Sequence, residues 1–332
     1  MSNQLGGTRE QIGFRITERD IEILGWLGRV RLARVEQVQW RFGMARSKAY
    51  RRLQVLWEAG LVGHESNVPG PGVYLATRAG LQWAELSLAS ATVSLATLKH
   101  DLAMTDVVAE LERDGKLLKV WTEREMRAEH ARPDGRRFAP RVHEPGRTRS
   151  GNHLPDIVVD LADDCWVAIE VERTAKRAER TRAILQGYYN AAGVSNLGRV
   201  VYVVPTPRDQ VRMNDLAAKV GFRAQRSASQ TDLMFGIGAA AVRFSAVRGY
   251  RGMASWLIKQ HCASVAADAE RARQIELQQE AVQVAREHEA AVQAQRAAQR
   301  EEILRRQRAE RERAAAEAAR PIKRFKRALS GG

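Results

Sequence analysis

Cysteine is nearly missing from this chain of 332 residues, which contains only Cys165 and Cys262 and no CxxC or Cys/His cluster. This scarcity excludes a disulfide framework and a structural zinc site, and we expect both thiols to be buried. Long apolar runs are also missing: the longest candidate, residues 236–246, contains Arg243 and is shorter than the roughly 20 residues of a membrane span. The opening residues, MSNQLGGTREQ, lack the apolar segment of a signal peptide. We therefore expect a cytoplasmic protein that does not enter a membrane.

Acidic residues are outnumbered by basic ones, 39 to 54, which gives a formal net charge of +15 and a pI near 10.4. A field of this sign favours a polyanionic partner. Nucleic acid is the first candidate, and an anionic membrane surface is the second. The 44% of hydrophobic residues is sufficient for real cores, and the length allows two domains plus an extension.

The pattern along the chain predicts an α+β multidomain protein. We expect a disordered N-terminus at residues 1–14, a DNA-binding domain at 15–92, a mixed α/β domain at 93–262, and a long helix or coiled coil with a basic tail at 263–332. The loop at residues 129–153 is rich in Arg, Pro and Gly, has no apolar period, and is predicted to lie on the surface.

The C-terminal region is predicted to be one helix, because residues 264–319 contain neither Gly nor Pro and consist largely of Ala, Gln, Arg and Glu. Pro321 is expected to end it. Ile275 and Val282 are seven residues apart and Ile303–Leu304 recur later, but the stripe is sparse. The pattern therefore leaves open a dimerising coiled coil and a solvated single helix. The tail PIKRFKRA is either a phosphate-contacting segment or a solvated terminus.

The N-terminal pattern indicates a helix-turn-helix. A first helix begins after Thr17, with Asp20 as its capping partner, and ends near Gly28. A second helix fits residues 32–42, Gly43 allows a tight corner, and a third helix fits residues 47–59 before Gly60. In the third helix, four apolar residues at three- and four-residue spacing are expected to face inward: Tyr50, Leu53, Leu56 and Trp57.

The third helix then presents four cations near its N-terminal half, namely Arg46, Lys48, Arg51 and Arg52, with no acid before Glu58. Cations on such a helix match the docking of a recognition helix into the major groove. The following residues, LVGHESNVPGPGVYLATRAG, contain two short extended runs around a Pro/Gly turn and a closing helix, which is typical of a winged helix. We predict double-stranded DNA as the partner. A bundle with a solvated basic face, and a winged helix used for protein contacts, are the alternatives.

The central region reads as a helix at 100–113, a strand at 117–122, two strands at 156–161 and 166–172 joined by a turn at 162–164, a helix at 174–191, a strand at 199–204 and a further helix after Pro207. This order indicates a mixed sheet flanked by helices. Alternation places Glu170 and Glu172 on one strand face, and the hairpin can return that face toward Asp156. Alternatively, these acids are the solvated face of an amphipathic strand, and Lys176, Arg177, Arg180 and Arg182 are an ordinary exposed helix face.

Pro155-Asp156, Glu170 and Glu172 resemble the motif of the PD-(D/E)xK nuclease superfamily. The resemblance implies a restriction-endonuclease-like fold, three carboxylates that hold Mg²⁺, and metal-assisted attack of water on a phosphodiester. Glu172 stands where the family has lysine, and Lys176 on the next helix is the candidate replacement. By this resemblance the catalytic residues are Asp156, Glu170, Glu172 and Lys176, with the three acids as metal ligands. A degraded nuclease fold that only binds DNA fits as well.

Together with the predicted winged helix, three segments resemble the replication-relaxation family of plasmids and integrative elements: LKHDLAMTD (98–106), LPDIVVDL (154–161) and EVERTAKRAERTRAILQGYY (170–189). The resemblance implies an accessory protein in replication, relaxation or transfer of a mobile element, with a relaxase or replication initiator as partner. No His-x-His triplet is present, so the chain does not look like the relaxase itself, and Tyr188 and Tyr189 are expected to pack in the core. A metal-dependent endonuclease and a winged-helix repressor remain the alternatives, and the C-terminal helix is a candidate for homo-oligomerisation.

Overall fold

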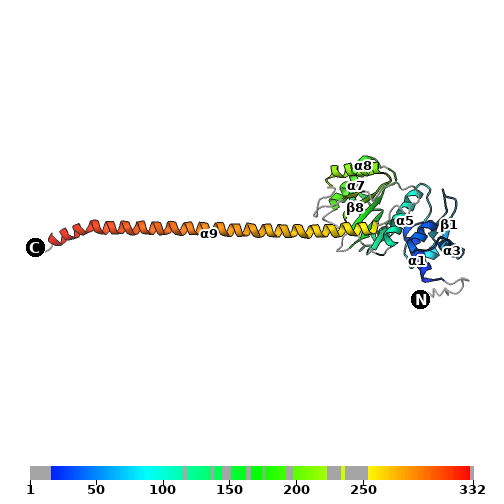
Figure 1. Cartoon of the computed structure of the whole chain (residues 1–332), viewed down its shortest axis with the longest axis horizontal. Coiled ribbons are helices and arrows are strands. Elements are labelled where there is room, and N and C mark those ends of the chain that lie inside the picture. Colours follow the sequence, from blue (N-terminus) through cyan, green and yellow to red (C-terminus); the bar gives the residue numbers. More distant parts are fainter. Residues whose placement is uncertain are drawn as a thin grey trace. The chain divides into compact units, whose positions relative to one another are not determined.

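The computed structural model of the chain describes residues 16–113, 115, 117, 119–135, 138–143, 151–161, 166–174, 176–191, 197–222, 233–235 and 253–329. The predicted disordered segment at 1–14, the predicted turn at 162–164 and Cys165 lie outside the described residues, as do the side chains of the basic tail. The chain divides into a compact unit, residues 1–268, and a second unit, residues 269–332 (Figure 1).

The N-terminal part of the first unit, here called the head (residues 16–83), contains the predicted three helices, hairpin and closing helix. Their bounds are α1 Glu18–Val30, α2 Val35–Phe42, α3 Arg46–Glu58, β1 Val62–Glu65, β2 Val73–Ala76 and α4 Arg78–Trp83. β1 and β2 are antiparallel. Two glycines in the left-handed region make the turns: Gly43 at φ 59° ends α2, and Gly60 at φ 71° follows α3.

The inward face of α3 differs from the predicted one. Ala49, Leu53 and Leu56 are fully buried, whereas Tyr50 and Trp57 are 53% and 49% exposed. The prediction that Tyr50 and Trp57 pack inward is therefore wrong. Leu53 and Leu56 are buried as predicted, but the position expected for Tyr50 is taken by the small Ala49, which lies about 100° away around the helix.

The second half of the first unit contains a five-stranded sheet in the order β3-β6-β7-β8-β9. β3 pairs antiparallel with β6, and β6 pairs antiparallel with β7, whereas the β7–β8 and β8–β9 pairs are parallel. Its elements are α5 Leu98–Arg113, β3 Lys119–Thr122, α6 Glu123–Ala131, β4 Arg141–Val142, β5 Gly151–Asn152, β6 Ile157–Asp160, β7 Trp166–Val171, α7 Ala178–Ala191, β8 Leu197–Val203, α8 Pro207–Val220 and β9 Leu233–Phe235.

Helices cover both faces of this sheet, as the apolar run of β7 requires. Val167, Ile169 and Val171 face the core that contains α5, and the alternate residues Trp166 and Ala168 face the core under α7 and α8 (Figure 1). The predicted surface loop at 129–153 is not wholly on the surface. α6 extends into it, and its apolar side chains Phe138 and Val142 are 0% and 3% exposed because they fill the core under α7.

The head and the sheet share one hydrophobic core through α5. Hydrogen bonds also join α2 of the head to α5: the Gln37 side-chain amide donates to Asp106 at 2.6 Å, and the Trp40 indole donates to Glu110 at 3.0 Å. Thr105 donates its hydroxyl to the carbonyl of Leu32 at 2.8 Å. The predicted domain boundary between residues 92 and 93 therefore does not interrupt the core.

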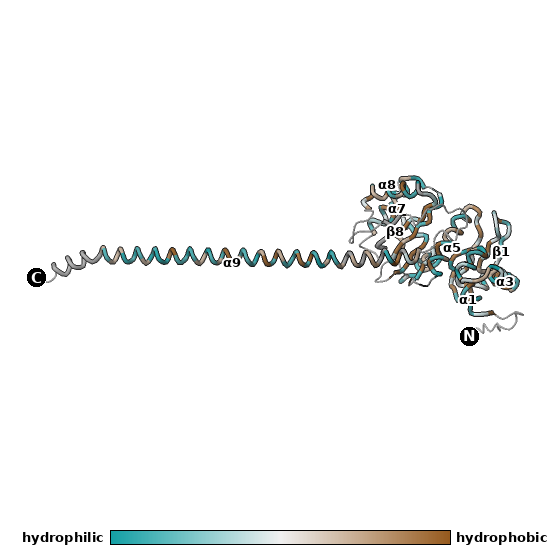
Figure 2. Tube along the Cα trace, in the orientation of Figure 1, coloured by the Kyte–Doolittle hydropathy of each residue, from teal (hydrophilic) through white to brown (hydrophobic). Residues whose placement is uncertain are grey.

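The long C-terminal helix is present as α9, Met253–Leu329. It continues through Pro321, so the prediction that this proline ends the helix is wrong; strong helix formers stand on both sides of it. Cys262 on this helix is exposed, which corrects the expected burial. Figure 2 shows hydrophilic and apolar residues mixed along the helix, and the sparse apolar side chains are exposed: Ile275, Val282, Ile303 and Leu304. Among the described residues, no helix has the length and apolarity to cross a bilayer.

Candidate functional site

The exposed face of α3 carries three of the four predicted DNA-contacting cations. Lys48 and Arg51 are exposed, and within the described part of the chain neither forms an ion pair. The Arg46 side chain is 70% exposed and lies 2.8 Å from the Glu36 carboxylate. An ion pair this exposed contributes little to stability, so it does not fix the position of the Arg46 side chain.

Arg52 differs from these three because its guanidinium is engaged within the head, and its predicted contact with DNA stays a prediction. Its guanidinium binds the Asp20 carboxylate, with Nε at 2.8 Å from Oδ1 and Nη2 against Oδ2. Asp20 is fully buried and also accepts hydrogen bonds from the Thr17 amide at 2.8 Å and the Thr17 hydroxyl at 2.6 Å. Arg52 therefore neutralises a buried charge at the start of α1 and holds α3 against it.

The β1–β2 hairpin lies beside α3 and is held to the start of α2. The Arg34 guanidinium donates to the carbonyl of Pro69, in the turn of the hairpin, at 2.8 Å. Ala33 and Tyr74 exchange backbone hydrogen bonds of 2.9 and 2.8 Å. The hairpin and α3 consequently form one continuous surface.

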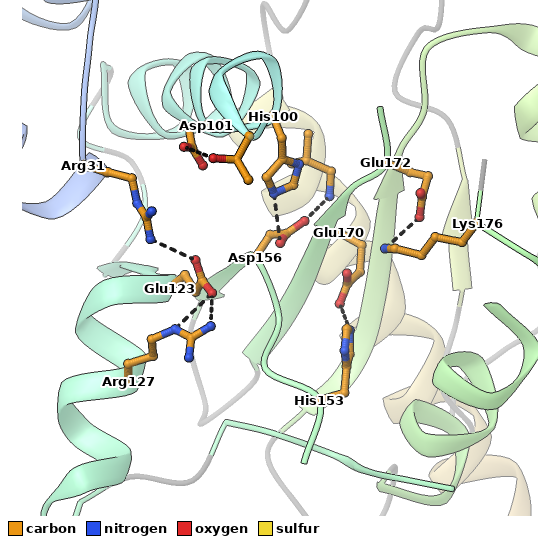
Figure 3. Close-up of polar contacts among 12 residues, drawn as sticks. Arg31, His100, Asp101, Glu123, Arg127, His153, Asp156, Glu170, Glu172 and Lys176 are labelled. Carbon is orange, nitrogen blue, oxygen red and sulfur yellow. Dashed lines mark hydrogen bonds and ion pairs between the residues drawn. The ribbon is translucent and has the colours of Figure 1, made fainter. Parts of the chain in front are cut away.

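A second candidate site lies on the α7 side of the sheet, where Asp156, Glu170, Glu172 and Lys176 come together (Figure 3). Asp156 precedes β6 and accepts the backbone amide of Val171 at 2.7 Å, which ties it to the end of β7. Glu170 and Glu172 are only 2% and 5% exposed. The alternative of a solvated acidic strand face is therefore wrong, since both acids face the covered side of the sheet.

Glu170 is enclosed by hydrogen-bond donors. Its Oε1 lies 2.8 Å from Nε2 of His153 and accepts the Tyr188 hydroxyl at 2.5 Å. Burial raises the pKa of Glu170, but the charge and hydrogen bond of His153, the charge of Lys176 and the Tyr188 hydrogen bond together hold that pKa below its usual value. Burial lowers the pKa of His153, and the Glu170 carboxylate outweighs this and raises it. The pair is thus stabilised as carboxylate and imidazolium.

Lys176 and His100 supply the remaining positive charge of the site. The Lys176 ammonium lies 2.9 Å from Glu172 Oε2. Burial lowers the pKa of Lys176, while Glu170 and Glu172 raise it above its usual value, so the amine stays charged. His100 Nε2 on α5 lies 3.4 Å from Asp156 Oδ1, and the contact with Asp156 raises the pKa of His100.

The donor chemistry of this site suits a hard divalent cation, because carboxylate oxygens are the ligands that Mg²⁺ prefers. The buried Tyr202 hydroxyl on the neighbouring strand has no hydrogen-bond partner within the described part of the chain, and its pKa is raised well above its usual value by burial and by Glu170. Among the described residues, however, no three acidic, histidine or cysteine side chains are grouped closely enough to hold a metal ion. In this arrangement His153 and Lys176 neutralise the acids.

Sequence reasoning missed His100, His153 and Tyr202 as members of this site, and it assigned Tyr188 to packing alone. Tyr188 does pack, at 1% exposure, but it also donates to Glu170. His153 had a usable signal, since it stands three residues before Asp156. His100 and Tyr202 had none, because only the fold brings α5 and β8 to these acids.

Comparison of the chain with protein-family models, with curated proteins and with solved structures gives no match.

Proposed function

We propose that the protein binds duplex DNA through α3 and the β1–β2 hairpin, which together act as a winged helix. One observation carries the proposal: Lys48 and Arg51 are exposed on the outer face of α3 and unpaired within the described chain, while the opposite face fills the head core. Cations presented in this way contact phosphates along the major groove and supply the sequence-independent part of the affinity.

The structure of the head supports this proposal in a second way. A recognition helix must be held rigidly for its contacts to add up. The Asp20–Arg52 contact fixes α3 to α1, and the Arg34 contact with Pro69 fixes the hairpin to α2. By its resemblance to the replication-relaxation family, the proposed setting is an accessory role in replication, relaxation or transfer of a plasmid or mobile element.

The test is a titration of fluorescent duplex DNA at several salt concentrations, with the full chain and with the variants Lys48→Ala, Arg51→Ala and their double mutant. Each lost phosphate contact lowers the slope of log K against log salt by about 1, so the double mutant is expected to lose about 2. Arg182→Ala is the matched control, because Arg182 is also exposed on a helix but lies on α7. Equal slopes for the double mutant and the control would refute the proposal.

Metal-assisted cleavage of DNA is the second candidate, favoured by the burial of Glu170 and Glu172 beside Lys176. In the arrangement described, these acids are not grouped closely enough for a metal ion. Asp156, Glu170 and Glu172 would therefore have to draw together to hold Mg²⁺, which would supply an activated water for attack on a phosphodiester. Lys176 would place a positive charge near the scissile phosphate. Incubation of supercoiled plasmid with Mg²⁺ or Mn²⁺ tests this: nicking is expected from the natural chain and not from Asp156→Ala or Glu170→Gln. No nicking with either metal, or nicking that survives these changes, argues against it.

A further inference from the structure

Two aromatic rings share the exposed surface of α3 with its cations. Tyr50 and Trp57 are 53% and 49% exposed. They are seven residues apart, so they lie on the same side of the helix, roughly 10 Å apart along its axis. Side chains with this much apolar area are mostly buried in folded proteins. Two of them side by side on a cationic helix therefore indicate a surface that binds something flat and apolar.

The hairpin continues this surface with two more rings. Trp57 meets His64 of β1 edge to face, at a centroid distance of 5.6 Å. His64 in turn stacks on Tyr74 of β2 at 4.5 Å with an interplanar angle of 19°. A Cβ at Gly72 would lie 2.4 Å from Nε2 of His64, so only glycine leaves room for this ring position. Tyr74 is 4% exposed and supports His64 from below, so the other three rings, Tyr50, Trp57 and His64, are called the aromatic surface below.

A hollow of about 650 Å³ opens between α3, the start of α2 and the hairpin. Tyr50, His64 and Tyr74 line it, and Arg46 and Glu36 stand among its polar residues. The hollow thus offers ring faces for stacking and both a donor and an acceptor for the edge of a planar polar ring. These are the features that recognise a nucleobase.

We propose that the aromatic surface stacks unpaired nucleobases, so that the protein gains affinity for single-stranded or locally melted DNA. The proposal rests on the proposed DNA binding and names a preferred form of the ligand. In an intact duplex the base faces are covered by neighbouring bases, so the rings of Tyr50 and Trp57 gain contacts only where a base leaves the stack. Arg46, which lines the same hollow as Tyr50, binds the backbone of that strand, which combines ring stacking with a basic groove. The charge favours DNA over an apolar protein segment as the occupant.

The experiment compares three fluorescent probes by anisotropy with the full chain: an oligothymidylate, a duplex of the same length, and that duplex with a central bubble of unpaired thymidines. The bubble is expected to bind more tightly than the duplex. Tyr50→Ala is expected to weaken binding to the bubble and the single strand by about five- to a hundred-fold, as for loss of one stacked base, and to change duplex affinity by less than about twofold. Tyr50→Phe keeps the ring and is expected to bind as the natural chain does. Lys48→Ala weakens all three probes.

A second pair, Trp57→Ala and Trp57→Phe, tests the other exposed ring in the same way. Both positions are half exposed, so truncation leaves no core cavity, and circular dichroism of each variant checks its folding. Equal affinity of the natural chain for duplex and bubble refutes the stacking proposal and leaves duplex binding intact. Alanine variants that keep full affinity for the bubble also refute it. Failure to bind any probe refutes both proposals.

Discussion

Removing Arg52 is expected to destabilise the head, in contrast to removing its neighbour Arg51. In Arg52→Ala the buried Asp20 carboxylate keeps only the two hydrogen bonds from Thr17. Removing one partner of a buried ion pair costs about 3–5 kcal/mol. Because Thr17 still donates and the Arg52 side chain is 26% exposed, we expect the lower end, about 3 kcal/mol.

Urea unfolding followed by tryptophan fluorescence measures this loss selectively. All seven tryptophans stand between residues 26 and 256, so the signal reports the first unit and not the exposed part of α9. With a slope of about 3 kcal/mol per molar urea, the midpoint falls by about 1 M. Arg51→Ala is the control and is expected to stay within about 0.5 kcal/mol of the natural chain, because Arg51 is exposed.

The double variant Asp20→Asn with Arg52→Ala is expected to lose less stability than the sum of the two single variants, since it leaves no unpaired buried charge. An Arg52→Ala variant that unfolds at the same urea concentration as Arg51→Ala would refute the assignment of Arg52 to the core contact.

Three further predictions concern other contacts. Burial raises the pKa of Asp106 from 3.8 to about 7. The folded state therefore binds a proton at Asp106 more tightly than the unfolded state does. The free energy of unfolding is expected to fall by about 4 kcal/mol at most as the pH rises from about 4 to 7. Urea unfolding across this range is expected to show that slope in the natural chain and a flatter one in Asp106→Asn. His153→Gln is expected to cost more stability at pH 6 than at pH 8. The pKa of His153 is raised, so its imidazolium pairs with the Glu170 carboxylate at the lower pH, and this ion pair is lost as the pH rises through the pKa of His153. An equal cost at both pH values contradicts this. Gly80→Ala is expected to lower the melting temperature. The added Cβ would lie 2.1 Å from the Leu61 carbonyl oxygen, and the backbone would have to shift at a cost of about 1–3 kcal/mol. An unchanged melting temperature contradicts that close contact.

Local signals in the sequence were sufficient for the backbone plan of the head. Gly43 and Gly60 stand where the chain needs a left-handed residue, and α1, α2 and α3 form within a few residues of the predicted bounds. Side-chain direction was harder to predict. Residues 49, 53 and 56 fit a helical stripe as well as 50, 53 and 57 do, and only the space in the core selects the small Ala49 over Tyr50.

The roles of the charged side chains could not be predicted, because they depend on contacts that the sequence does not show. Arg51 and Arg52 are adjacent and chemically alike, and only Asp20, 32 residues earlier, distinguishes them. Alternation on β7 correctly put Glu170 and Glu172 on one face, but it could not tell a covered face from a solvated one. That distinction required α7, whose Tyr188 covers Glu170. The metal-ligand and catalytic roles of the acids stay predictions.

The contact between α2 and α5 has a practical consequence for engineering. Gln37 and Trp40 of the head reach Asp106 and Glu110 on a helix that also packs against the sheet. Cutting the chain between these helices would leave apolar surface and two acids of α5 uncovered on one fragment. A transplanted head would therefore have to carry α5 with it to keep these surfaces covered.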